Sequence, residues 1–168
     1  MGLIVQEGAG VTLVVGYSPE YHDQGGTAMS ERLSMVVFSG TVDKLFPVAI
    51  LASGAVAMEQ EVNIFLTFWG LDAFRKGEPQ QNMRMSKDFE DKGRAVMAMM
   101  QQKKVPSWYQ TLKTAKELGN GNVRIHACAM TMDLMGMSKD DLDPIVDDVV
   151  GVGEFVEEAQ KGNVTLFI

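Results

Sequence analysis

The chain has 168 residues, about the size of one domain and too short for two comfortable ones. Its formal net charge of -7 and pI near 4.8 argue against a nucleic-acid or anionic-membrane partner, because such binding depends on Lys and Arg neutralising phosphates. The longest apolar run, residues 46–58, is shorter than the ~20 residues that a membrane-spanning helix needs, so we predict no membrane insertion. The chain start has no basic residue ahead of an apolar stretch, and we therefore expect a cytoplasmic location.

The first 28 residues differ in pattern from the rest of the chain. Two short β-like runs, residues 3–5 and 11–15, flank the turn-like sequence EGAG, which is typical of a β-hairpin. Met29 begins a sequence that resembles a natural chain start, so we predict an N-terminal extension over residues 1–28 and one domain over residues 29–168. The extension has three interpretations: an appendage, the product of an upstream start codon, or a strand donated to a neighbouring subunit.

From residue 33 onward, apolar runs of strand length alternate with helical stretches. The first two predicted strands, residues 33–38 and 62–68, enclose an apolar segment of helical length, residues 45–58. Two further strands are predicted at residues 123–129 and 164–168. Near-continuous apolar strands separated by helices are typical of a parallel sheet that is covered on both faces, and hence of an α/β protein.

The segments between these strands carry helix signals. Asp43 stands where an N-terminal cap would precede the first helix, and Ser138 opens a Ser-x-x-Asp capping box for a helix over residues 138–150. Residues 77–106 are longer than a usual α/β connection. We predict in them a Met-rich helical insertion, with a helix over residues 83–104, as a candidate lid or subunit contact.

Several polar and reactive side chains follow the predicted strands directly. Ligands of an open parallel sheet bind outside the carboxyl ends of its strands, so these side chains are candidate pocket residues. The chain has no glycine-rich phosphate fingerprint and no metal-ligand spacing, and we therefore predict no nucleotide cofactor and no metal centre. The predicted pocket residues at the strand ends are Ser39, Gly40, Trp69, Gly70, Cys128, Met130, Thr131 and Asp133.

Cys128 is the only cysteine, which excludes an intramolecular disulfide and a Cys-based zinc site. Main-chain N–H groups at a strand end favour a reactive thiolate, whereas a free cysteine in a core behaves as a small hydrophobic residue. His126 lies two residues earlier on the same face of the strand, ~7 Å away. It either supports the thiol or has a purely structural role. Met130 and Met132 supply soft ligands for Cu(I) or, alternatively, adaptable core packing.

Four segments together resemble a known family. The sequences VVFSGTVDK, IFLTFWGLDAFRK and IHACAMTMDLMG, followed by the terminal NVTLFI, are similar to DsrE/DsrF-like proteins, particularly the DsrE-like sulfur-handling subgroup that is sometimes labelled peroxiredoxin-family. The resemblance covers roughly residues 31–168. It implies a three-layer α/β/α fold with a central, mainly parallel sheet of about five strands, and assembly as a trimer or hexamer.

The resemblance also implies a chemistry. The family cysteine that follows the penultimate strand carries sulfur as a persulfide, and the matching residue here is Cys128. The expected function is a cofactor-free sulfur carrier or sulfurtransferase whose partners are sulfur donor and acceptor proteins. The alternative is a non-enzymatic, oligomeric adaptor subunit in which Cys128 is inert. A third hypothesis is a soft-metal binder that uses Cys128 with Met130 or Met132.

Overall fold

The computed structural model describes residues 31–168, so the predicted extension and hairpin over residues 1–28 lie outside the described residues. A five-stranded, all-parallel sheet forms the centre, in the order β4-β3-β2-β1-β5. This arrangement confirms the predicted α/β class with a mainly parallel sheet. The strands are β1 (Arg32–Val37), β2 (Glu61–Leu66), β3 (Val123–Cys128), β4 (Asp148–Val150) and β5 (Val164–Phe167).

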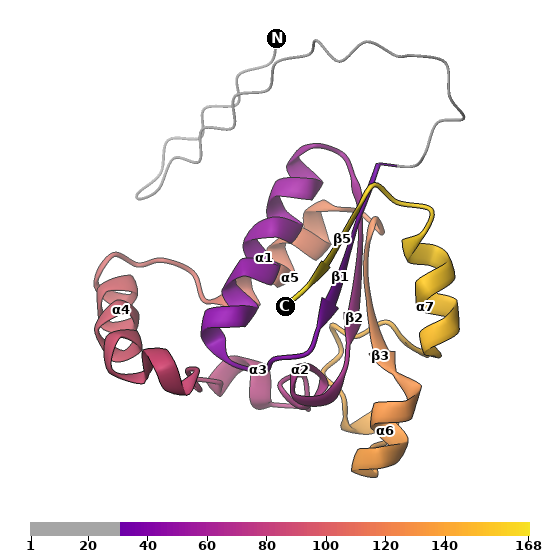
Figure 1. The fold of residues 1–168 in the computed structure, drawn as a ribbon. Coiled ribbons are helices and arrows are strands. Elements are labelled where there is room, and N and C mark those ends of the chain that lie inside the picture. The colour runs from indigo at the N-terminus through magenta and orange to yellow at the C-terminus, as the bar shows by residue number, and fades with distance from the viewer. Residues whose placement is uncertain (1–30) are drawn as a thin grey trace, which may run out of the picture.

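Helices cover both faces of the sheet, as the expected three layers require (Figure 1). Helices α1 (Val42–Ala57) and α5 (Trp108–Leu118) lie on one face, and α7 (Val152–Ala159) lies on the other. Among the described residues no helix has both the length and the apolarity of a membrane span. The short helices α2 (Phe68–Asp72), α3 (Glu78–Gln81) and α6 (Ala129–Met135) lie near the carboxyl ends of the strands. Helix α4 (Glu90–Gln102) lies beyond α1, away from the sheet.

The two faces of the sheet are packed very differently. Successive strand residues point to opposite faces, so Val123, Ile125 and Ala127 of β3 enter the large core with α1 and α5. Cys128 points to the α7 face and joins a smaller apolar cluster. The face under α7 is therefore the thinner layer, and it is the layer that holds the cysteine.

The predicted helix over residues 138–150 is wrong. Ser138 and Asp141 do form the capping box, but it opens only a short 3-10 turn, Lys139–Asp141, and strand β4 and helix α7 follow. Pro144 disfavours helical geometry at the residue before it. The Asp143 carboxylate also accepts a hydrogen bond from the Ile145 N–H at 3.1 Å, which gives the backbone a turn instead of a helix.

The helix predicted over residues 83–104 is shorter than expected, because it begins only at Glu90 after a 3-10 turn at Lys87–Phe89. The preceding loop is held in a non-helical path by hydrogen bonds to the start of α1. The Asn82 side chain donates to the Gly40 carbonyl at 2.9 Å, and the Ser86 N–H and hydroxyl donate to the Asp43 carboxylate. Thr41, and not Asp43, occupies the N-cap position of α1.

The Asp43–Ser86 contact predicts a pH-dependent contribution to stability. Burial raises the pKa of Asp43, but the hydrogen bonds from Ser86 outweigh it and hold this pKa below its usual value. A carboxyl group of this kind stabilises the fold above its unfolded-state pKa of ~3.9, and the contribution is lost as the pH falls through the folded-state pKa. We expect Asp43→Asn to cost about 1 kcal/mol near neutral pH and progressively less in acid.

Urea unfolding of both proteins at a series of pH values from ~6 down to ~2 measures this difference. A difference that stays constant over the whole series would show that ionised Asp43 does not hold the loop.

Candidate functional site

Cys128 is the last residue of β3 and the N-cap residue of α6. Only 2% of its surface is exposed. The cysteine belongs to an apolar cluster in which the rings of Phe65 and Phe155 stack with centroids 4.6 Å apart. A reagent or a partner therefore reaches the thiol only after one of the covering elements has moved. The cluster consists of Phe65, Cys128, Val150, Phe155 and Ala159, with Val36 packed against it.

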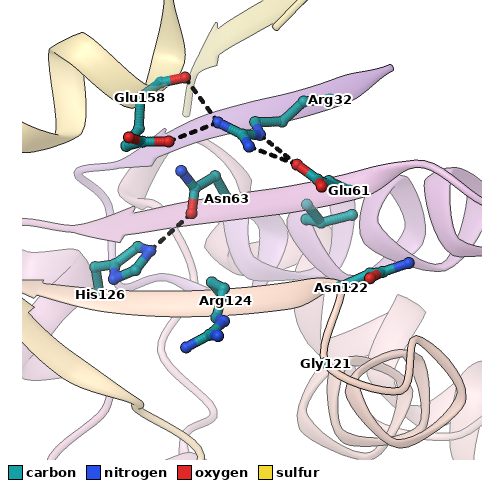
Figure 2. Close-up of a pocket in the computed structure, with 9 residues that line it drawn as sticks. Arg32, Glu61, Asn63, Gly121, Asn122, Arg124, His126 and Glu158 are labelled. Atoms are coloured by element: carbon teal, nitrogen blue, oxygen red, sulfur yellow. Dashed lines mark hydrogen bonds and ion pairs between the residues drawn. The ribbon is translucent and has the colours of Figure 1, made fainter. Parts of the chain in front are cut away.

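His126 precedes Cys128 on the same face of β3, but its ring is bonded elsewhere. Its Nε2 lies 2.7 Å from the Asn63 side-chain oxygen, and its Nδ1 is hydrogen bonded to the Asp148 carboxylate (Figure 2 draws the Asn63 contact). No hydrogen bond joins His126 to Cys128 within residues 31–168. The imidazole ties β2, β3 and β4 together across the sheet, which is the structural interpretation of this residue.

A polar pocket of about 320 Å³ lies beside His126, over the amino-terminal halves of the strands (Figure 2). The Arg32 guanidinium crosses it and donates to the carboxylates of Glu61 on β2 and Glu158 on α7. This pairing fastens the carboxyl-terminal part of α7 to the sheet. The ion pairs of Arg32 lie at the amino-terminal ends of β1 and β2, whereas Cys128 ends β3, so the structure does not bring these charged groups to the thiol.

Gly40, which follows β1, and Gly70, in α2, each pack against a neighbouring backbone. A Cβ atom on Gly40 would lie 2.2 Å from the Trp69 carbonyl oxygen, and one on Gly70 would lie 2.2 Å from the Val37 carbonyl oxygen. The Ser39 hydroxyl is 3.1 Å from the Thr41 hydroxyl. These contacts give Gly40 and Gly70 a packing role at the carboxyl ends of β1 and β2.

The predicted pocket residues of α6 differ in burial. The buried Thr131 hydroxyl lies 3.0 Å from the Thr67 hydroxyl and accepts from the Phe68 N–H, which joins α6 to the end of β2. Met130 is 61% exposed, and the Asp133 carboxylate makes no hydrogen bond in the part of the chain that is described.

The structure separates one proposed metal ligand from the thiol. Met132 is buried in the large core on the α1 side, whereas Cys128 belongs to the cluster under α7. Within residues 31–168, no group of three or more His, Cys, Asp or Glu side chains has the arrangement of a metal site.

Sequence reasoning missed the residues that cover the thiol. Phe65 stands in a predicted strand, but nothing in its local pattern shows that it faces Cys128. Phe155 and Ala159 belong to a helix that was not predicted, and they reach the cysteine only because α7 crosses back over the sheet. The apolar spacing of Phe155 and Ala159, four residues apart, is the signal that could have indicated this helix.

Known proteins resemble the chain along most of its length. The model of the DsrE/DsrF/DrsH-like family matches residues 29–98 and 80–167. The "Uncharacterized protein YrkE" of Bacillus subtilis is 36% identical over 165 residues, covering 84% of this chain and 99% of that protein. The "Sulfur carrier protein DsrE2" of Allochromatium vinosum is 31% identical over 159 residues, covering 82% of this chain and 98% of that protein.

A solved structure gives a weaker match. The protein of unknown function MTH1491 from Methanobacterium thermoautotrophicum has a TM-score of 0.47 and 19% identity, covering 82% of this chain and 99% of that one. The family match spans nearly all of residues 29–167, and both curated relatives align along almost their whole length. This chain therefore belongs to the DsrE/DsrF/DrsH-like family.

Proposed function

We propose that this protein is a sulfur carrier that holds sulfur as a persulfide on Cys128 and relays it from a donor protein to an acceptor protein. The observation that carries the proposal is the position of the sole cysteine, at the carboxyl end of β3 in a member of this family. The likeness to a relative named as a sulfur carrier supports the same role.

The relay consists of two thiol exchange steps. The Cys128 thiolate attacks the outer sulfur of a donor persulfide, the donor leaves as a thiolate, and Cys128 becomes a persulfide. An acceptor thiolate then attacks the outer sulfur of that persulfide, and the Cys128 thiolate leaves. The sulfur changes hands without net oxidation, so neither step requires a cofactor. With no second cysteine in the chain, the persulfide cannot be lost to an intramolecular disulfide.

The buried position of the thiol adds a requirement to this proposal. Because only 2% of Cys128 is exposed, both exchange steps need a conformation in which α6 or α7 has moved. Helix α7 supplies Phe155 and Ala159 to the cluster that contains Cys128, so its movement would expose the thiol directly. We therefore expect partner proteins to act on the carboxyl end of the sheet.

Intact-mass spectrometry tests the proposal. After incubation with a persulfide donor, we expect the wild type to gain ~32 Da, the mass of one sulfur atom, and to lose it again when a thiol acceptor is added. Cys128→Ser should gain nothing, because the nucleophile is absent. Equal adducts on both proteins, or none on the wild type while a surface-exposed control thiol is loaded, would contradict the relay.

The burial of Cys128 favours a second candidate function. In this alternative the thiol is inert, and the protein is a homo-oligomeric adaptor that docks through the exposed Met-rich segment around α4. A wild type that acquires no sulfur would make this alternative the leading one. The trimeric or hexameric state stays a prediction under either function.

A further inference from the structure

An open apolar pocket of about 320 Å³ lies under α7, between this helix and strands β2, β1 and β5. Its volume is within the usual range for small-molecule sites. Six of its eight lining residues are apolar, and no charged side chain lines it. The lining residues are Val36, Phe65, Val152, Phe155, Val156, Ala159, Gln160 and Thr165.

This pocket and the buried thiol share a wall. Phe65, Phe155 and Ala159 line the pocket and also belong to the cluster that contains Cys128. Val36, which packs against the same cluster, lines the pocket as well. The pocket and the thiol are therefore neighbours through side chains that both environments have in common.

The absence of charged side chains from the lining favours an uncharged ligand. A charged compound such as thiosulfate or an ionised peptide persulfide would lose its hydration in the pocket without gaining an ionic partner there. An uncharged molecule with short alkyl groups loses little favourable hydration on entering the pocket, and it gains apolar contacts there. Sulfur atoms also make favourable contacts with aromatic rings, and two rings, Phe65 and Phe155, are present.

We infer that the pocket under α7 binds a small, uncharged organic sulfur compound, of the dialkyl polysulfide class. The expectation that the ligand is apolar follows from the lining of the pocket. The assignment of sulfur to the ligand rests in part on the proposed function. Such a compound would reach the shared wall of Cys128 without a protein partner. The pocket is distinct from the polar pocket beside His126, with which it has no lining residue in common.

The test is a binding titration of the full chain with di-n-propyl sulfide, an unreactive analogue that has no sulfur–sulfur bond, followed by NMR on isotope-labelled valine methyl groups. We expect shifts at Val36, Val152 and Val156, which line the pocket, and none at Val96, an exposed valine on α4. The dianion 3,3′-thiodipropionate should bind at least tenfold more weakly, and di-n-propyl ether several-fold more weakly. Cys128→Ser should bind di-n-propyl sulfide as the wild type does.

Two substitutions that fill the pocket complete the test. Val156→Phe and Ala159→Leu should each weaken binding at least tenfold, and the matched control Val96→Phe should not, since Val96 is similarly exposed but remote. Absence of shifts at the pocket methyl groups, or wild-type affinity in both filled variants, would overturn the site. Equal affinity for the ether would overturn the sulfur assignment. Pocket binding in a protein that gains no persulfide on Cys128 from a persulfide donor would uphold the pocket while refuting the proposed relay.

Discussion

Gly70→Ala is expected to destabilise the protein by about 3 kcal/mol, at the upper end of the usual cost of overpacking. A Cβ atom at this position would lie 2.2 Å from the Val37 carbonyl oxygen and 2.8 Å from its carbonyl carbon. Val37 belongs to the inner strand β1, which pairs with β2 on one side and β5 on the other, so its backbone cannot shift without disturbing a neighbouring strand. The close approach is also fixed by the hydrogen bond from the Gly70 N–H to the Phe38 carbonyl at 2.7 Å.

Gly54→Ala provides the matched control for this prediction. Gly54 lies inside α1, and an added Cβ atom meets nothing within 4 Å. Alanine has the higher helix propensity, so we expect this substitution to stabilise the protein by about 0.5–1 kcal/mol. Chemical denaturation of the three proteins measures both effects. If Gly70→Ala unfolds at the same denaturant concentration as the wild type, the backbone contact does not determine the packing of α2 on β1.

Phe155→Ala is expected to make Cys128 reactive in the folded protein. The ring of Phe155 is 4% exposed and stacks on Phe65 in the cluster that buries the thiol. Its removal opens the cover and costs ~3–5 kcal/mol, which is typical of deleting a buried aromatic side chain. We expect alkylation of Cys128 by iodoacetamide, followed by mass spectrometry under native conditions, to become at least tenfold faster.

Two controls separate local opening from global unfolding. Leu112→Ala removes a fully buried side chain from α5 on the other face of the sheet, so it lowers stability without uncovering the thiol. Phe167→Ala removes an aromatic ring that is 72% exposed on β5. We expect both to label much more slowly than Phe155→Ala. If Leu112→Ala labels as fast as Phe155→Ala at equal stability, α7 is not the local cover of the cysteine.

Local sequence patterns were sufficient to predict the main strands of the fold. The apolar runs that predicted strands at residues 33–38, 62–68 and 123–129 correspond to β1, β2 and β3 within one or two residues. Each of these strands is buried over most of its length, so burial produces a largely apolar run. Strand β4 has only three residues and was missed, because so short a run carries little pattern.

The sequence by itself determined the parallel sheet and the position of Cys128 at the carboxyl end of a strand, since both follow from the order of short apolar runs. Only the tertiary structure decided what surrounds that cysteine. His126 is bonded to Asn63 and Asp148, and Phe155 covers the thiol, through contacts between segments far apart in the chain. Such contacts depend on how α7 crosses the sheet, and no local periodicity specifies that path.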